Sequence, residues 1–151
     1  NGMWGYKIID QNYKSAETLI RYLVSASGKG ANLLLNIGPQ PNGELPAASL
    51  ERLKALGEWT ERYGETIYGT TAGDVPVQDW GVTTRKGESL YVHIFDHKDK
   101  ELLLPITCRV KEAYVYDTKK TLKTKRTGNG VTIFFDEVPS GTDYIVVLKT
   151  R

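Results

Sequence analysis

The sequence predicts a chain in two parts, an α/β part with the order helix, strand, helix, followed by an all-β sandwich. In residues 1–72, apolar side chains recur at helical spacing on either side of one near-continuous apolar run. In residues 73–151, apolar and polar side chains alternate between frequent turn residues. Of the 151 residues, 40% are hydrophobic and 25% are charged, which excludes a disordered tail or a coiled coil as a description of the whole chain.

The first helix is predicted to begin after Ser15, because a serine hydroxyl can accept a hydrogen bond from a free amide of the first turn. Gly28 is expected to end this helix, since glycine tolerates the left-handed conformation beyond the last turn. The expected apolar positions between them are Leu19, Tyr22, Leu23 and Ala26.

Residues 32–37 are predicted to form a strand that is buried on both faces, as in a parallel sheet, because the run is nearly all apolar. Turn residues follow, and Pro46 is then expected at the first position of a second helix, which Gly64 can end. The apolar side of that helix is expected to comprise Leu50, Leu53, Leu56, Trp59 and Tyr63.

A parallel strand needs neighbours on both sides for its backbone hydrogen bonds, and the sequence offers none of that type. We therefore expect the chain to be the C-terminal portion of a larger protein, or its core to be completed by other copies.

A small-residue stretch at residues 69–73 suggests a linker between the two parts. Beyond it, alternation places Leu90, Val92 and Ile94 on one face of a strand and Tyr91, His93 and Phe95 on the other. A second strand has Val131, Ile133 and Phe135 on one face, and residues 144–148 form a further run. Residues 127–130 predict a hairpin, since Asn and Gly accept positive φ. Six to eight short strands are expected in all, as in a β-sandwich.

The net charge of +2 is too small to indicate nucleic acid or an anionic membrane as the main partner. The longest purely apolar run, residues 33–35, is far shorter than the roughly 20 residues of a membrane-spanning helix. The single cysteine, Cys108, cannot form an internal disulfide and says nothing about the redox compartment. We expect it to be a buried or incidental thiol.

Several other patterns allow two interpretations. His93 and His97 share a strand face, but no third ligand has a spacing that supports a metal site. Trp80 and Tyr91 suggest either a sugar-stacking platform or core packing. The basic residues within 109–126 suggest either polyanion binding or protection of an exposed strand edge. A solvated helix face is the expectation for Glu51, Glu58, Glu61 and Glu65, and a local charge role for Asp10 and Glu17.

A series of short motifs then resembles the end of the catalytic domain of the α-L-fucosidases of glycoside hydrolase family 29. The motifs occur in order over roughly 70 residues. They are Asn-Gly-Met-Trp-Gly-Tyr at 1–6, Gly-Ala-Asn-Leu-Leu-Leu-Asn-Ile-Gly-Pro at 30–39, Asn-Gly at 42–43, Leu-Gly-Glu-Trp at 56–59 and Tyr-Gly-Glu-Thr-Ile-Tyr-Gly-Thr at 63–70. The second half resembles the C-terminal β-sandwich of the family, a weaker match that depends on its position and on the phrase at 87–91.

The resemblance implies that residues 1–72 are the C-terminal part of a (β/α)8-like barrel and residues 73–151 a C-terminal β-sandwich. It implies retaining hydrolysis of terminal α-L-fucose from glycans by an Asp nucleophile and a Glu acid/base, whose carboxyl groups lie roughly 5–5.5 Å apart. It implies no cofactor, and as partners a fucosylated glycan and the missing N-terminal part of the barrel. The family is secreted, periplasmic or lysosomal.

The chain departs from the family pattern in one respect, because both catalytic carboxylates of the family would precede Asn1. We therefore assign no catalytic residue, and we expect this chain alone to be inactive. The alternative function is that of a carbohydrate-binding or structural accessory module.

Three residues are candidates for substrate binding. The resemblance places Trp4 near the mouth of the active site, where an aromatic ring can stack on a sugar or contact the C6 methyl of fucose; the other possibility is a core position. Tyr6 is a candidate by proximity. Asn36 is expected at the C-terminal end of the buried strand, where barrel active sites lie, to position a catalytic group or to hold the next loop.

Overall fold

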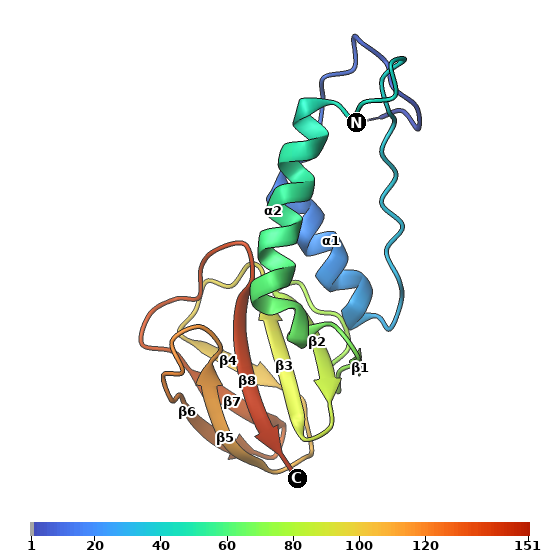
Figure 1. Cartoon of the computed structure of the whole chain (residues 1–151). Coiled ribbons are helices and arrows are strands. Elements are labelled where there is room, and N and C mark those ends of the chain that lie inside the picture. The colour runs from blue at the N-terminus through green and yellow to red at the C-terminus, as the bar shows by residue number, and fades with distance from the viewer. Residues whose placement is uncertain (1) are drawn as a thin grey trace.

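The computed structural model describes residues 2–151, so Asn1, the first residue of the motif at 1–6, lies outside the described residues. Two helices stand on a β-structure, and the N-terminal segment lies at their far end (Figure 1). The helical elements are α1 (Ala16–Gly28), α2 (Ala47–Tyr63) and the 3-10 turn η1 (Gly64–Thr66). The strands are β1 (Thr71–Ala72), β2 (Gly81–Lys86), β3 (Ser89–Ile94), β4 (Glu101–Leu104), β5 (Val110–Val115), β6 (Lys123–Thr127), β7 (Gly130–Phe134) and β8 (Tyr144–Thr150).

The strands form two antiparallel sheets, one with the order β1-β2-β3-β8-β5 and the other with the order β4-β7-β6. One core cluster fills the space between the sheets, and alternate strand residues supply it because successive side chains point to opposite faces. The predicted alternation is confirmed, since this cluster contains Leu90, Val92, Ile94, Val131, Ile133, Phe135, Val146 and Leu148. The strand content of residues 73–151, β2 to β8, also lies within the predicted range.

The predicted hairpin at residues 127–130 is present, with Thr127 paired to Gly130 across the β6–β7 turn. The positive φ of this turn lies at Gly130, at 138°. A Cβ at Gly130 would also lie 2.1 Å from the carbonyl oxygen of Leu104, so both the conformation and the space require glycine there.

α1 begins as the sequence predicts, because the hydroxyl oxygen of Ser15 accepts a hydrogen bond from the backbone amide of Thr18 at 3.1 Å. Gly28 is the last residue of α1, but the reason for a glycine at this position differs from the prediction. The left-handed residue after the helix is Gly30, with φ of 67°. Gly28 instead lies where α1 crosses β2, and a Cβ there would be 2.5 Å from Cβ of Val82.

The ends of the helices nearest the sandwich pack on part of the outer face of the five-stranded sheet and form a second core with it. This core joins Ile20, Val24, Trp59 and Ile67 to Val82, Tyr91, Ile145 and Val147. Sheet residues are therefore buried on both faces, since helices cover one side and the second sheet covers the other. The stretch at 69–73, expected as a linker, contains β1, which pairs with β2. The division of the chain at residue 72 stays a prediction.

α2 differs from the prediction in its start and in its buried face. Pro46 precedes the helix as its N-cap and is not its first helical residue. Trp59 is the one buried residue of α2, whereas Leu50 is 52% exposed. On α1, Tyr22 is likewise exposed. In the part of the chain that the structure describes, no helix combines the length and the apolar character needed to cross a membrane.

The strand predicted at residues 32–37 is not formed. The segment runs extended beside the helices without a strand partner, and Leu34 is 83% exposed (Figure 1). The prediction used side-chain character alone, but a strand also needs a neighbouring backbone that supplies hydrogen bonds. The strands of the described residues all pair elsewhere, in the two antiparallel sheets.

Candidate functional site

The segment around Trp4 and the segment around Asn36 lie side by side. The side-chain amide of Asn36 donates a hydrogen bond to the backbone carbonyl oxygen of Trp4, with an N···O distance of 2.5 Å. Two residues further along, a Cβ at Gly38 would lie 2.5 Å from the backbone nitrogen of Tyr6 and 2.6 Å from the carbonyl carbon of Gly5. Glycine at position 38 therefore allows the two backbones to approach closely.

A cavity of about 300 Å³ lies between these two segments and the helices. Trp4, Lys14, Tyr22, Asn36 and Leu53 are among its lining residues. The volume is at the lower end of the range for small-ligand pockets. Of the three predicted binding residues, the structure brings Trp4 and Asn36 into the cavity wall, while half-buried Tyr6 is not among the lining residues.

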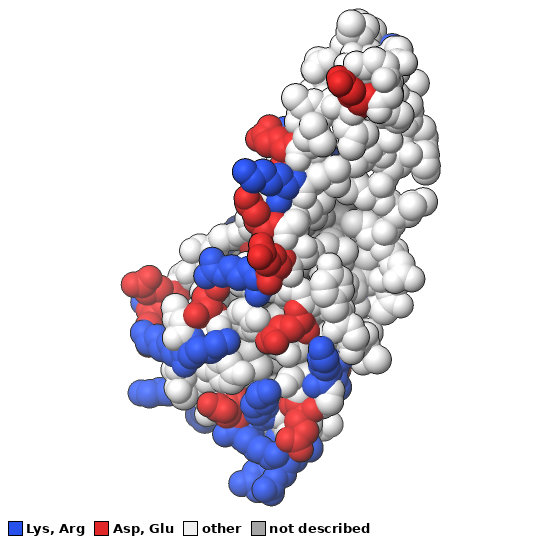
Figure 2. Space-filling view, viewed as in Figure 1, with Lys and Arg blue, Asp and Glu red and all other residues white. Residues whose placement is uncertain are grey.

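The surface around this cavity is apolar and open. Trp4 is 74% exposed, and Met3, Tyr22, Leu34 and Leu50 also expose large parts of their side chains. The end of the molecule that carries the N-terminal segment shows almost no charged side chains on the face in view, whereas charges gather along α2 and over the sheets (Figure 2). Apolar surface of this extent marks a region that binds another molecule or another part of a protein.

The cavity can bind a ligand, but its lining holds no general acid or base. None of its lining residues is Asp, Glu or His, and Lys14 is its one charged side chain. An aromatic ring, an amide and an ammonium group can stack on and hydrogen-bond a polyhydroxylated ligand. Hydrolysis of a glycosidic bond needs two carboxyl groups in addition.

The carboxylates of α2 and the N-terminal segment have structural partners. Glu51 pairs with Arg52, and Glu58 lies 3.9 Å from Lys54. Asp10 accepts hydrogen bonds from the backbone amides of Gly2 and Asn12. The expectation of a solvated helix face is confirmed for Glu51, Glu58 and Glu61, which are exposed.

Glu65 is exposed in η1 but lies near a group of tyrosines. Burial, followed by the charge of Glu65 and a hydrogen bond to it, raises the pKa of Tyr116 to about 12. Burial and the same charge raise the pKa of Tyr91, and burial followed by the charges of Glu112 and Glu65 raises that of Tyr114. Glu65 is thus exposed, as expected, and its carboxylate also raises the pKa of neighbouring tyrosines.

The two histidines have different surroundings, because β3 ends at Ile94 and His97 is half-buried in the following loop. His97 Nε2 lies 2.9 Å from the carbonyl oxygen of Glu101, while His93 is fully buried. Within residues 2–151, no group of three or more His, Cys, Asp or Glu side chains is arranged to hold a metal ion.

Trp80 and Tyr91 cannot form one platform, because they pack in different cores. Trp80 packs against the cluster between the sheets, and Tyr91 lies in the cluster beneath the helices. Of the two interpretations, core packing is correct. In the basic stretch, every residue of β6 is exposed and β6 is an edge strand, which favours the edge-protection interpretation of Lys123 and Lys125.

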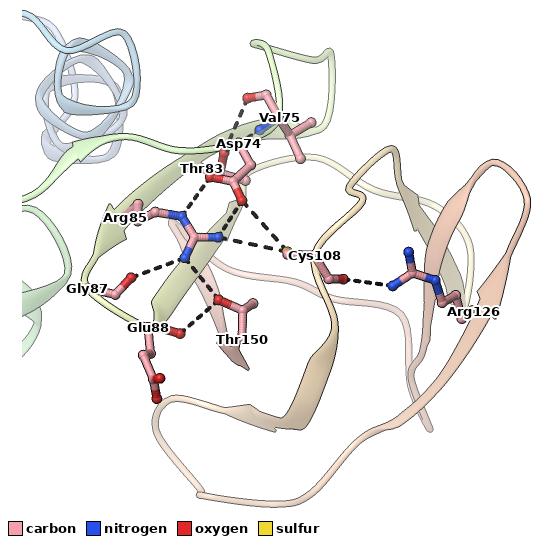
Figure 3. Close-up of polar contacts among 9 residues, drawn as sticks. All are labelled: Asp74, Val75, Thr83, Arg85, Gly87, Glu88, Cys108, Arg126 and Thr150. Carbon is pink, nitrogen blue, oxygen red and sulfur yellow. Dashed lines mark hydrogen bonds and ion pairs between the residues drawn. The ribbon is translucent and has the colours of Figure 1, made fainter.

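Sequence reasoning missed a polar cluster at the end of the sandwich far from the helices. The guanidinium of Arg85 makes a two-pronged contact with the carboxylate of Asp74, with 2.6 Å between Nε and Oδ1, and Nη1 donates to the hydroxyl of Thr150 at 3.0 Å (Figure 3). The hydrogen bond to Asp74 raises the pKa of Arg85. Half-buried Cys108 points into this cluster, with its Sγ 3.8 Å from Asp74. The cluster joins segments that are far apart in sequence, so no local sequence pattern predicts it.

Comparison with known proteins finds that this chain is similar to alpha-L-fucosidases. A family model described as alpha-L-fucosidase matches residues 1–65. The chain is 36% identical over 100 residues to human plasma alpha-L-fucosidase and 29% identical over 144 residues to bovine tissue alpha-L-fucosidase. These matches cover 61% and 90% of this chain, but 21% and 31% of the two relatives.

Solved structures match along nearly the whole chain. Alpha-L-fucosidase isoenzyme 1 from Paenibacillus thiaminolyticus superposes with a TM-score of 0.87 at 30% identity, covering 100% of this chain and 38% of that one. An alpha-L-fucosidase GH29 from Bacteroides thetaiotaomicron gives 0.88 at 27% identity, covering 98% of this chain and 35% of that one. The chain belongs to the α-L-fucosidase family, as the motifs at 1–6 and 30–39 predict.

Proposed function

We propose that residues 1–72 are the closing elements of a (β/α)8-like catalytic barrel and residues 73–151 the C-terminal sandwich of a retaining α-L-fucosidase. The extended, unpaired segment 32–37 is the observation that carries this proposal. Its apolar side chains suit a buried strand, yet Leu34 is 83% exposed. Barrel strands on either side of this segment would bury it and supply its missing hydrogen bonds.

The cavity beside this segment supports a role in sugar binding. Asn36 lies near the end of the segment, and active sites of barrel enzymes lie at the C-terminal ends of the strands. We assign to Trp4 stacking on the sugar or contact with its C6 methyl group, and to Asn36 the positioning of the loop that carries Trp4. Tyr6 is assigned to the rim of the same site, because its backbone lies against Gly38.

The catalytic carboxylates are assigned to sequence upstream of this chain, since the cavity lining holds none. A related alpha-L-fucosidase GH29 from Bacteroides thetaiotaomicron has been solved as a trapped covalent intermediate with 2-fluoro-fucosyl fluoride, and another bacterial fucosidase with an iminocyclitol inhibitor. These relatives support a retaining mechanism on terminal α-L-fucose, with a fucosylated glycan as the substrate. They also support the proposal that this chain needs the rest of the barrel as its partner. A secreted, periplasmic or lysosomal location follows from the same proposal.

The test is hydrolysis of 4-nitrophenyl α-L-fucoside by two preparations, residues 1–151 alone and the same residues preceded by the natural upstream sequence. We expect turnover from the longer protein and none above the uncatalysed rate from the chain alone, because no Asp or Glu is among the described residues that line the cavity to act as nucleophile or proton donor. Enzyme-like turnover by residues 1–151 would contradict the assignment of both carboxylates to the upstream part.

For the sandwich, we propose a bracing role in preference to sugar binding. Arg21 of α1 donates hydrogen bonds to the carbonyl oxygens of Phe95, Gly141 and Thr142, in the loops that flank the five-stranded sheet. The sandwich thus holds a helix of the proposed barrel in place. Calorimetry with fucose and fucosylated oligosaccharides tests this, since heat of binding at the sandwich would favour the carbohydrate-binding alternative.

A further inference from the structure

A buried pair of titratable side chains lies beneath the helices, away from the cavity. His93 of β3 and Asp143, just before β8, both have fully buried side chains. Their Nδ1 and Oδ2 atoms are 2.9 Å apart. On the other side of the ring, Nε2 of His93 lies 3.3 Å from the hydroxyl oxygen of Thr84.

The hydrogen bonds around the ring of His93 indicate its charge. The hydroxyl oxygen of Thr84 lies 2.5 Å from the backbone carbonyl oxygen of Thr66, and a carbonyl only accepts, so the single hydroxyl hydrogen of Thr84 is used there. Nε2 of His93 therefore meets an oxygen lone pair and needs a hydrogen of its own. A second hydrogen lies between Nδ1 and Oδ2 of Asp143, and it belongs to Nδ1 when Asp143 is ionised. A ring with hydrogen on both nitrogens is an imidazolium cation.

The residues around His93 also favour a positively charged ring. A buried carboxylate without a compensating cation is very costly, and Oδ1 of Asp143 has no hydrogen-bond partner among the residues described. The nearby titratable group on the helical side is the phenol of Tyr63, whose pKa is raised mainly by burial, and also by Asp117 and Asp143. The guanidinium of Arg21 reaches the backbone of Gly141 and Thr142 but makes no hydrogen bond or ion pair with the Asp143 carboxylate. His93 is thus the one cation in contact with it.

We propose that His93 and Asp143 form a buried ion pair that locks the loop at residues 139–143 onto the sheet and so holds α1 in place through Arg21. The chain of contacts is continuous. Thr66 and Thr84 fix the ring of His93, the ring holds Asp143, and the adjacent carbonyl oxygens of Gly141 and Thr142 accept from Arg21. The pair therefore connects the two parts of the chain as a latch, in addition to packing in the core.

The charge is tested by NMR of the imidazole nitrogens, for which the chain provides its own reference because it has only two histidines. Spectra are recorded at pH 8, above the pH near 6.5 at which a free histidine loses its charge, and half-buried His97 supplies a second imidazole signal for comparison. We expect the ring of His93 to show two protonated nitrogens at that pH. A neutral His93 ring, in either tautomer, would overturn the ion pair.

The latch is tested with Asp143→Asn, and Asp136→Asn is the matched control, because Asp136 makes an exposed ion pair with Lys120. Removing the charge of one member of a buried ion pair should lower the melting temperature by roughly 10 °C, whereas loss of an exposed ion pair should shift it by about 2 °C or less. Hydrogen exchange then locates the effect. In Asp143→Asn we expect amides of α1 to exchange at least tenfold faster, with those of β4 and β7 changed much less. A uniform increase over the chain, or no increase in α1, would overturn the latch.

Discussion

The side-chain amide of Asn36 donates a hydrogen bond to the backbone carbonyl oxygen of Trp4, and this bond joins segments that are 32 residues apart. Both residues line the cavity, and Trp4 projects a largely exposed ring beside it. The position of that ring therefore depends on a side chain from the other segment. The first prediction concerns this bond.

Replacement of Asn36 by Ala in the intact enzyme removes the bond and frees the Trp4 segment. A neutral hydrogen bond contributes about 1 kcal/mol, so we expect kcat/KM for 4-nitrophenyl α-L-fucoside to fall roughly fivefold. Asn42→Ala is the matched control, because the Asn42 amide contacts only the nearby Glu44. Equal kinetics for Asn36→Ala and the control would remove Asn36 from the site.

Trp4→Ala tests the stacking role more directly. Loss of an aromatic contact in the ground state weakens binding, so we expect KM to rise roughly 3- to 10-fold with a smaller change in kcat. Trp4→Phe keeps a ring and should recover most of the affinity. If both variants bind an iminocyclitol inhibitor as tightly as the unmodified enzyme, Trp4 has only a packing role.

Gly28→Ala tests the contact between α1 and β2. The added Cβ would lie 2.5 Å from Cβ of Val82, and we expect the free energy of unfolding in urea to fall by about 1–3 kcal/mol. Gly57→Ala on α2 is the control, since a Cβ there meets nothing within 4 Å, and alanine in a helix is favoured by about 0.5–1 kcal/mol. Val82→Ala removes Cγ2, which would lie 2.7 Å from the added Cβ, but leaves the Cβ contact, so the double variant should lose less than the sum of the two single losses. Strict additivity would argue against a direct clash.

The tyrosines beneath η1 predict a loss of stability at alkaline pH. The pKa of Tyr116 is raised from 10.0 to about 12 by burial and by Glu65. The folded chain thus keeps this proton where the unfolded chain has lost it, so the contribution of Tyr116 is full below pH 10 and is lost as the pH rises toward 12. Urea unfolding between pH 9 and 12 should show this decline, and Tyr116→Phe should make it shallower. An identical decline in the variant would contradict the assignment.

Local patterns predicted much of the fold, because they act over a few residues. The Ser15 cap, the alternation in β3 and β7 and the hairpin at Thr127 and Gly130 each depend on neighbours in sequence. The exposed Leu34 was misjudged, since a strand depends on partners that the local sequence does not specify.

The site was predictable only in part. The resemblance of the motifs pointed to Trp4 and Asn36, and the structure brings them together. The pairs His93–Asp143 and Arg85–Asp74 were not foreseen, because 50 and 11 residues separate their members and only the sheet register brings them into contact. Tyr6 was named as a candidate with Trp4, but it is not among the residues that line the cavity.

Amide hydrogen exchange at Leu33, Leu34 and Leu35 is the most direct test of the central claim that this segment is a barrel strand. In residues 1–151 alone the segment has no strand partner, so these amides should exchange at rates near those of an unstructured chain. In the protein that includes the natural upstream sequence, neighbouring strands should slow their exchange by at least a hundredfold. Equally fast exchange in both proteins would contradict the claim.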